Sequence, residues 1–195
     1  PIVTLITYIT YLVFNLFGIK IEYKKTIFTR EEVRHIIKES GETGVLADGE
    51  HKLLHRVFEL NDKFAKEVMV TRDKIVAINA DMGQDDIVRI ITEEGHTRYP
   101  VYRHSIDNVI GIIHSKAIIN MLINNPLFVL EDLMMEPYFV PEDKEISKIL
   151  AEFQQKGLHV AIVKDTQGAV SGLIQIKDIL KVIFGELTEK TIPDL

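Results

Sequence analysis

The stretch GHTRYPVYRHSIDNVIGIIH, residues 95–114, returns later in the chain as GLHVAIVKDTQGAVSGLIQI, residues 157–176. Each copy holds two apolar runs separated by a polar turn, which is the pattern of a β-hairpin. From Tyr99 onward the two copies match at a constant offset of 61 residues, so that Gly111 corresponds to Gly172. The chain therefore contains an internal repeat, and the repeat decides the fold.

The elements that frame each hairpin also correspond. A short extended piece comes first, then a helix with apolar residues at helical spacing that ends at Gly95 or Gly157, and a closing helix follows the hairpin. The extended pieces are DKIVAIN (73–79) and PYFVP (137–141), and the closing helices are SKAIINMLI (115–123) and KDILKVIF (177–184). The sequence predicts an α+β fold of two β-α-β-β-α units, residues 68–125 and 126–187, packed as a pseudo-two-fold pair around one core.

The bulk composition excludes several classes of protein. A net charge of −6 argues against nucleic acid as a partner, because phosphate backbones bind basic surfaces. The chain has no cysteine, which excludes disulfide scaffolds, thiolate zinc sites and cysteine nucleophiles together.

The chain opens with PIVTLITYITYLVFNLFGI, residues 1–19, which carries no charge. A bilayer core needs about 20 apolar residues in a helix, so the length just qualifies. Lys20, Lys24 and Lys25 follow, and such clusters favour the cytoplasmic side of a membrane. We expect residues 1–25 to form a membrane-proximal apolar helix that spans the membrane or lies on its surface; a buried globular helix is the alternative. The proline at position 1 indicates a fragment of a longer protein.

Residues 26–67 are predicted to form a helical connector without a core of its own. Thr29 and Glu32 have the spacing of a capping box at the start of a first helix, and Gly41 is its expected end. A second helix is expected within residues 49–62, and residues 188–195 form an exit tail.

Four segments carry a resemblance to a known family. They are GVLADGEHKLLHRVFELNDKFAKEVM (44–69), VMVTRDKIVAI (68–78), GHTRYPVY (95–102) and SGLIQIKDILKVIFGEL (171–187). Over residues 29–187 the chain resembles a tandem pair of cystathionine-β-synthase (CBS) domains, or Bateman module. More narrowly it resembles the CorC/HlyC family, the bacterial relatives of the cyclin-M magnesium transporters.

The resemblance implies an adenine nucleotide site in a cleft between the units. The family pattern G-h-h-[ST]-x-x-D falls on Gly172, Gln175 and Asp178, with Lys177 beside them. The Asp178 carboxylate would accept ribose hydroxyls; a plain helix cap is the alternative. The first unit has His114 and Ala117 at the corresponding positions, and therefore lacks the carboxylate. We expect at most one nucleotide site per chain.

Further contacts are implied for the opposite side of the cleft. Thr97 and Arg98 match positions that face the nucleotide, and Arg98 would hold phosphate; a surface salt bridge is its alternative. Tyr99 and Pro100 would border the adenine; a side chain that fills the face of its strand is the alternative for Tyr99. Arg72 matches a family arginine near the same cleft. The chain departs from the family in two places: Val70 and Thr71 replace Thr-Pro, and Gln175 replaces Thr or Ser.

No enzyme active site is indicated by the sequence. His51 and His55 are four residues apart, but HKLLH lacks the glutamate that metalloproteases place after the first histidine. The sequence therefore favours the interpretation that His51 and His55 are exposed on a helix and bind no metal.

The resemblance implies a cytosolic regulatory module, on the cytoplasmic face of the membrane, of a divalent-cation (magnesium or cobalt) transport or efflux protein. Its ligand would be an adenine nucleotide, ATP or AMP, with Mg²⁺ as counter-ion. Its partners would be a second copy of the chain, through the CBS units, and a transmembrane domain of the same chain. The alternative is a ligand-free structural dimerisation module, which the departures at Val70, Ala117 and Gln175 favour. Nothing in the sequence supports the hemolysin name that some relatives carry.

Overall fold

The computed structural model describes residues 28–124 and 129–185. The predicted apolar helix of residues 1–25 and the exit tail of residues 188–195 lie outside this range. In the described part of the chain, every helix is too short or too polar to cross a bilayer.

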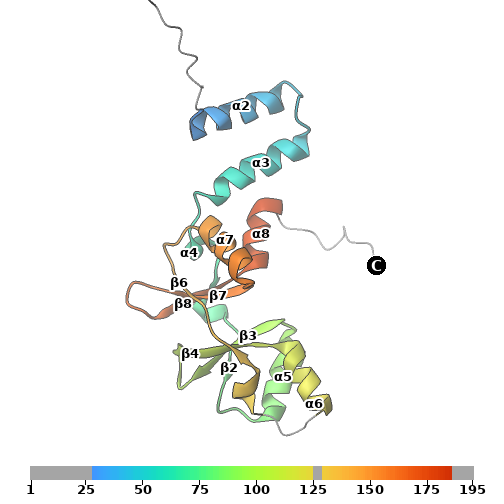
Figure 1. Ribbon diagram of the computed structural model, residues 1–195, viewed down its shortest axis with the longest axis vertical. Coiled ribbons are helices and arrows are strands. Elements are labelled where there is room, and N and C mark those ends of the chain that lie inside the picture. The colour runs from blue at the N-terminus through green and yellow to red at the C-terminus, as the bar shows by residue number, and fades with distance from the viewer. Residues whose placement is uncertain (1–27, 125–128, 186–195) are drawn as a thin grey trace, which may run out of the picture.

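The two repeated units are confirmed, and each contains the predicted order of elements. Unit 1 consists of β2 (Ile78–Asn79), α5 (Gln84–Glu94), β3 (Arg98–Arg103), β4 (Ser105–His114) and α6 (Ser115–Asn124). Unit 2 consists of β6 (Phe139–Pro141), α7 (Ile146–Lys156), β7 (Val160–Lys164), β8 (Val170–Gln175) and α8 (Ile176–Phe184). In Figure 1, unit 2 lies in the middle of the molecule, with unit 1 below it and the connector above.

Both α5 and α7 end where the sequence predicts. Gly95 and Gly157 have φ angles of 63° and 66°, in the left-handed region that glycine adopts without a steric penalty. Each helix is thereby turned back into the first strand of its hairpin, and this places Arg98 and His159 at corresponding points in the two units.

The sequence did not predict that each sheet borrows a strand. β1 (Val70–Thr71) lies at the start of unit 1, yet it pairs antiparallel with β8 of unit 2, giving the strand order β1-β8-β7-β6. β5 (Met134–Met135) lies at the start of unit 2, yet it pairs with β4 of unit 1, giving the order β2-β3-β4-β5. Because each sheet contains a strand from the other unit, the two units form one domain.

The repeated glycines lie where the borrowed strands cross. A Cβ on Gly172 would lie 2.3 Å from the sulfur of Met69 and 2.7 Å from the backbone oxygen of Val70. A Cβ on Gly111 would lie 2.5 Å from the sulfur of Met134. Each glycine therefore provides the space for a methionine that enters with the strand from outside its unit.

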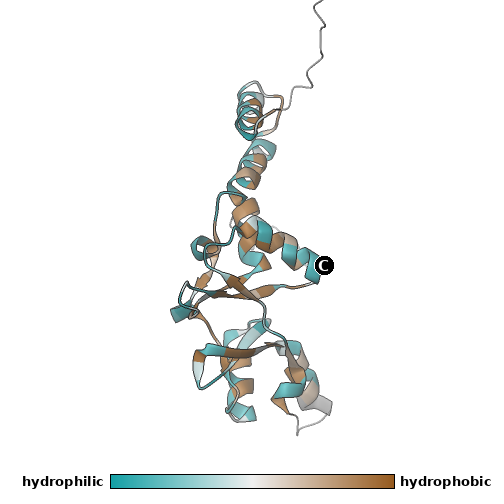
Figure 2. Ribbon diagram, turned by 60° about the vertical axis from the view of Figure 1, so that its left-hand side comes forward, coloured by the Kyte–Doolittle hydropathy of each residue, from teal (hydrophilic) through white to brown (hydrophobic). Residues whose placement is uncertain are grey.

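The apolar side chains of the units form three packed groups. One lies inside unit 1, around Ile78, Tyr99 and Ile113, and one lies inside unit 2, around Phe153 and Ile179. The third lies between the units. It combines Val109 and Ile112 of unit 1 with Val160, Ile162, Val170 and Leu173 of unit 2, and Ile75 packs against it. Figure 2 shows hydrophobic residues concentrated along the strands, where the units meet.

The connector contains α2 (Arg30–Glu42), α3 (Asp48–Leu60) and the short α4 (Ala65–Val68). The predicted capping box is present: the Thr29 amide donates to Glu32 Oε2 at 2.7 Å, and the Glu32 amide donates to Thr29 Oγ1 at 3.3 Å. The predicted end at Gly41 is wrong by one residue, because α2 continues to Glu42. Two 3-10 turns complete the described elements, Arg72–Lys74 and Leu130–Leu133.

The connector is attached to unit 2. Leu60, the last residue of α3, is buried in the core of unit 2 together with Ile179 of α8. The amide of Ala65 donates to the carbonyl of Lys144 at 2.9 Å, and the amide of Ile146 donates to the carbonyl of Lys63 at 3.0 Å. The end of α3 and the segment that leads into α4 are therefore fixed to unit 2.

A matched pair of substitutions tests the crossing contacts. We expect Gly172→Ala to lower the free energy of unfolding by about 1–3 kcal/mol, because the added methyl meets the fixed backbone oxygen of Val70. We expect Gly111→Ala to cost less, because the added methyl meets the side chain of Met134 and no backbone oxygen; the sulfur and Cγ of Met134 can turn away, which leaves its Cβ at 2.8 Å. Urea denaturation of the two variants measures both values. Equal losses would contradict the role given to the Val70 backbone.

Candidate functional site

A cleft of about 250 Å³ lies between the two units. Unit 2 contributes the end of β8 and the start of α8, and unit 1 contributes the start of β3. The segment that links β1 to β2 closes the cleft. The lining residues are Val70, Lys74, Ile75, Val76, His96, Arg98, Pro100, Leu173, Gln175, Lys177, Asp178 and Lys181.

The cleft carries positive charge in an acidic chain. Lys74, Arg98, Lys177 and Lys181 line it, and Asp178 is the single carboxylate among its lining residues. Within residues 28–124 and 129–185, none of these four cations lies within 4.0 Å of a carboxylate. The net charge of the whole chain is −6. Free cations gathered at one cleft favour a ligand with several negative charges.

Asp178 is placed by the first turn of α8 and is 9% exposed. Its Oδ2 accepts a hydrogen bond from the backbone amide of Gln175 at 3.1 Å, so the carboxylate does cap the helix. A carboxylate has two oxygens, and capping by Oδ2 is compatible with ligand binding by Oδ1. The two interpretations made from the sequence are therefore not exclusive.

Five of the eight residues predicted for the site line this cleft: Arg98, Pro100, Gln175, Lys177 and Asp178. Sequence reasoning did not single out Lys74, His96 or Lys181. The signal for Lys181 was available, because it follows Lys177 by one helical turn and therefore lies on the same face of α8.

Tyr99 and Thr97 do not line the cleft. The Tyr99 side chain is fully buried in the core of unit 1, and its hydroxyl accepts a hydrogen bond from the His96 amide at 2.8 Å. Burial raises the pKa of this hydroxyl. Thr97 is exposed, and its carbonyl accepts from the Ser115 amide at 2.9 Å. Tyr99 thus positions His96 and the start of β3.

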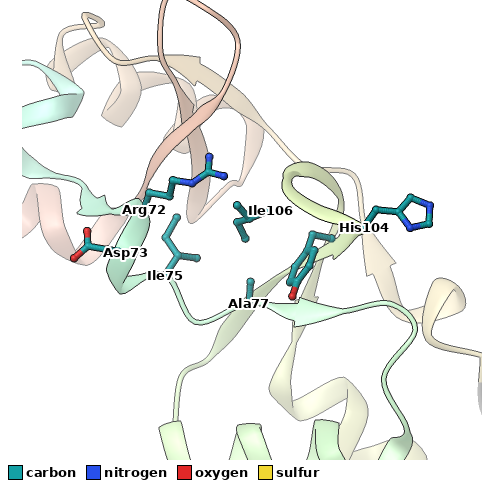
Figure 3. A pocket seen from close by; sticks show the side chains of 7 residues that line it. Arg72, Asp73, Ile75, Ala77, His104 and Ile106 are labelled. Atoms are coloured by element: carbon teal, nitrogen blue, oxygen red, sulfur yellow. The ribbon is translucent and has the colours of Figure 1, made fainter.

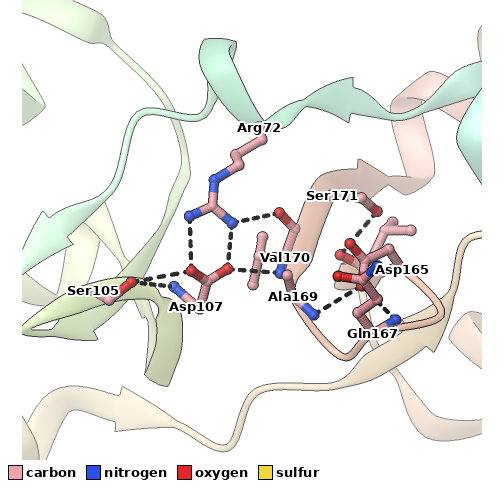
Figure 4. A network of polar contacts seen from close by, with 9 residues as sticks. Arg72, Ser105, Asp107, Asp165, Gln167, Ala169, Val170 and Ser171 are labelled. Carbon is pink, nitrogen blue, oxygen red and sulfur yellow. Dashed lines mark hydrogen bonds and ion pairs between the residues drawn. The ribbon is translucent and has the colours of Figure 1, made fainter.

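Arg72 lies in a polar network that fastens the two units. Its guanidinium donates to both carboxylate oxygens of Asp107 in unit 1, and Nη1 donates to the carbonyl of Val170 in unit 2 at 2.8 Å (Figure 4). The Val170 amide in turn donates to Asp107 Oδ1 at 2.9 Å. These hydrogen bonds hold the pKa of Asp107 well below its usual range. The bond from Arg72 has the largest effect, and the bond from the Val170 amide has the next largest.

Arg72 also borders a wider hollow of about 710 Å³, which shares the lining residue Ile75 with the cationic cleft. Figure 3 shows Arg72 and His104 at opposite ends of this hollow, with Ile75 and Ile106 between them. His104 forms the tight turn of the unit 1 hairpin with a φ of 66°. Because Arg72 is committed to Asp107, the hollow offers less free charge than the cleft.

The histidine pair on α3 has structural neighbours. A Cβ added at Gly41 would lie 2.5 Å from the ring of His51, so His51 packs against α2. His55 Nδ1 lies 3.3 Å from Glu59. The described residues contain no group of three or more histidines and carboxylates that could hold a metal ion.

Residues 65–124 and 130–185 each match the family model of the CBS domain. The UPF0053 protein YrkA of Bacillus subtilis is 32% identical over 97% of this chain, and the magnesium and cobalt efflux protein CorC of Pasteurella multocida is 33% identical over 83%. The chain spans about half the length of these relatives, 45% and 54% respectively.

Solved structures are similar over the same region. The CBS domain of a bacterial CNNM/CorC family Mg²⁺ transporter, in complex with the inhibitor IGN95a, gives a TM-score of 0.78 at 29% identity. The match covers 83% of this chain and all of that one. A CBS domain of that transporter family in complex with ATP gives a TM-score of 0.67 at 30% identity, over 71% of this chain and 99% of that one.

The network in Figure 4 generates a pH-dependent prediction. The pKa of Asp107 is lowered in the folded state, so its charge stabilises the fold above the ordinary carboxyl pKa of 3.8, and this contribution declines as the pH falls below that value. Asp107→Asn should reduce stability at pH 7. The difference between wild type and variant should shrink as the pH falls from about 5 toward 2. Urea denaturation across this range checks the trend, and a difference that stays constant would contradict it.

Proposed function

The chain belongs to the CBS domain family, and from that membership we propose that it is the nucleotide-sensing regulatory module of a CorC-type divalent-cation transport or efflux protein. The observation that carries the proposal is the inter-unit cleft. Its four cations, which have no carboxylate within 4.0 Å in the described part of the chain, and Asp178 surround an apolar wall. Such a surface suits a ligand with an apolar ring, a sugar and phosphates.

The ligand that fits these groups best is an adenine nucleotide. Val70, Ile75 and Leu173 supply an apolar surface for a base, and the Asp178 carboxylate can accept ribose hydroxyl groups. Arg98 and the three lysines can bind phosphate oxygens. A related CBS domain has been solved with ATP and another CBS pair, from Klebsiella pneumoniae, with AMP.

Magnesium enters this proposal as the counter-ion of the nucleotide. Mg²⁺ is commonly bound through substrate phosphates and water with only one or two protein carboxylates. The cleft offers only Asp178 as a carboxylate among its lining residues, so the nucleotide phosphates and water would supply most of the oxygen atoms that bind Mg²⁺.

The proposed action is binding without turnover. The cleft supplies groups that hold an anion, and its carboxylate already caps a helix, an arrangement that suits a sensor better than an acid or base catalyst. The relatives that share this region include proteins named for magnesium and cobalt efflux.

Helix α8 provides a route from the cleft to the connector. Its first turn carries Asp178, and the next residue, Ile179, packs in the same core as Leu60 at the end of α3. Beyond its last turn, the position of Gly185 lies against the guanidinium of Arg56 on α3. A ligand that shifts α8 would therefore move α3 and α2, which lead toward the proposed membrane-proximal segment and transmembrane domain on the cytoplasmic face.

A ligand-free structural module is the second candidate. Val70 and Gln175 both line the cleft, so the two departures from the family pattern fall inside the proposed site. Val70 removes a hydroxyl but keeps an apolar surface for the base. Gln175 keeps a hydrogen-bonding side chain. Unit 1 has Ala117 at the position that corresponds to Asp178, and this third departure leaves the Asp178 carboxylate of unit 2 in place. The cationic lining favours the nucleotide sensor.

Substitutions in the cleft test the nucleotide site. Removing one charged hydrogen-bond partner costs about 1.5–3 kcal/mol, so Asp178→Ala and Arg98→Ala should each weaken ATP binding roughly ten- to a hundredfold. Arg98→Ala should affect ATP more than adenosine, whereas Asp178→Ala should affect both. Isothermal titration calorimetry with ATP, ADP, AMP and adenosine, with and without Mg²⁺, measures these differences.

Two controls accompany this experiment. Asp178→Asn keeps an oxygen that can cap α8 and removes the charge, which separates ligand binding from helix stability. Lys38→Ala removes an exposed cation on α2, far from the cleft in the connector, and should leave ATP affinity unchanged. Wild-type protein that binds no nucleotide at millimolar concentration would favour the structural module.

We also propose that two chains associate through the CBS units. Ile119 on α6 and Phe184 on α8 are 48% and 50% exposed in the single chain, which leaves apolar surface on the closing helices of both units. A biological interface should bury more than about 1,000 Å². Light scattering at micromolar concentration should give the mass of a dimer, and Ile119→Glu should shift it toward monomer. A wild-type monomer throughout that range would contradict the proposal.

A further inference from the structure

The turn between β6 and α7, residues 142–145, receives the end of the connector. In addition to the two backbone bonds given above, the Lys66 amide donates to the carbonyl of Glu142 at 3.0 Å. Phe64 and Glu145 form an isolated antiparallel bridge at the same place. Because these contacts are made by backbone groups, they depend on the conformation of this receiving turn.

The side chain of Lys144 ties the receiving turn to α7. Its Nζ donates to Oε1 and Oε2 of Glu152 at 2.6 and 2.7 Å. The hydroxyl of Tyr138, the residue before β6, donates to Oε2 of the same carboxylate at 2.9 Å. Lys156 Nζ lies 4.2 Å from the centre of the Tyr138 ring. One carboxylate on α7 thus joins the turn and the start of β6.

This ion pair is better protected from water than the others. The side chains of Lys144 and Glu152 are 22% and 28% exposed, the lowest values of any ion pair in residues 28–124 and 129–185. A partly buried pair is screened less than an exposed one. Burial acts to raise the pKa of Glu152, but the hydrogen bonds from Lys144 and Tyr138 and the nearby positive charges outweigh it and lower the pKa. The carboxylate is therefore charged at neutral pH.

The repeat makes this group of side chains specific to unit 2. Counted back from the glycine that ends α5 or α7, Glu152 corresponds to Ile90 and Lys144 corresponds to Met82. Isoleucine and methionine cannot form an ion pair. The polar group is therefore found in the unit to which the connector is attached.

We propose that Lys144, Glu152 and Tyr138 form a latch that holds the receiving turn in the conformation that binds the connector. The closed latch fixes residues 63–66 to unit 2, next to the core contact of Leu60. When the latch opens, this segment detaches while the core of unit 2 stays folded. The latch thereby determines how much of a nucleotide-induced shift in unit 2 reaches α3. This last step rests on the proposed function, whereas the latch itself does not.

Amide hydrogen exchange, followed by NMR, tests the latch. Lys144→Met introduces the residue that unit 1 has at this position, and Glu152→Gln removes the charge with little change of shape. Each should speed exchange at the amides of Ala65 and Lys66 roughly tenfold, because loss of a charged hydrogen-bond partner favours local opening. The amides of β7 and β8 should keep their rates.

Lys148→Met is the matched control. Lys148 pairs with Glu145 at 2.9 Å on the same helix, but its side chain is 63% exposed, so its loss should leave exchange at Ala65 unchanged. Lys144→Glu combined with Glu152→Lys should restore the slow exchange that Lys144→Glu alone loses. Unchanged exchange at Ala65 in both Lys144→Met and Glu152→Gln would overturn the latch. Equal acceleration in β7 and β8 would show a general loss of stability and would overturn it as well.

Titration with ATP separates the latch from the proposed function. Lys144 does not line the cationic cleft, so Lys144→Met should keep the affinity for ATP. The ATP-induced shift changes in α3 should be at least about twofold smaller than in the wild type, because α3 is then held at fewer points. If exchange responds as expected but ATP does not bind, the latch stands and the sensor fails. If ATP binds and the changes in α3 are equal in both proteins, the sensor stands and the role of the latch in transmission is wrong.

Discussion

The fold depends on two crossings in which a strand from outside each unit lies over a glycine of its hairpin. Met69 enters against Gly172, and Met134 enters against Gly111, so close that a Cβ on either glycine would force the neighbouring atoms to shift. The crossings allow β1 and β5 to complete the sheets of the opposite units. They also determine where the chain between β1 and β2 runs. That segment closes the cationic cleft and places Arg72 beside Asp107. The cleft and the Arg72–Asp107 network between the units therefore both depend on the crossing of Met69 over Gly172.

The two units have the same arrangement of helices and strands, but different residues occupy some of their corresponding positions, and this difference determines the chemistry of the cleft. The corresponding positions 117 and 178 are alanine and aspartate, and the corresponding positions 98 and 159 are arginine and histidine. The asymmetry gives the pseudo-symmetric pair one large cationic cleft lined by Asp178 and one small cleft, beside the starts of β3 and β7, whose unit has alanine at the corresponding position. Attachment of α3 to the core of unit 2 means that the unit carrying Asp178 is also the unit that holds the connector.

The repeat, the helix ends at Gly95 and Gly157 and the capping box at Thr29 could all be predicted, because each depends on local sequence. The strand exchange could not, since β1 and β5 are two residues long and their partners lie far away in the chain. The placement of Arg72 was equally out of reach, whereas the core position of Tyr99 was the alternative that its strand offered. Tyr99 alternates into the core from its strand, and Arg72 is held by Asp107, a residue that no motif indicated.

Backbone amide NMR during titration with ATP tests the central claim most directly, namely that a nucleotide binds between the units and acts through α8. The account predicts the largest shift changes within residues 70–76, 96–100 and 173–181, with smaller changes continuing along α8 into α3. Changes centred on the wider hollow at Tyr102, His104 and Ile106 would contradict it, as would changes confined to the cleft with none in α3.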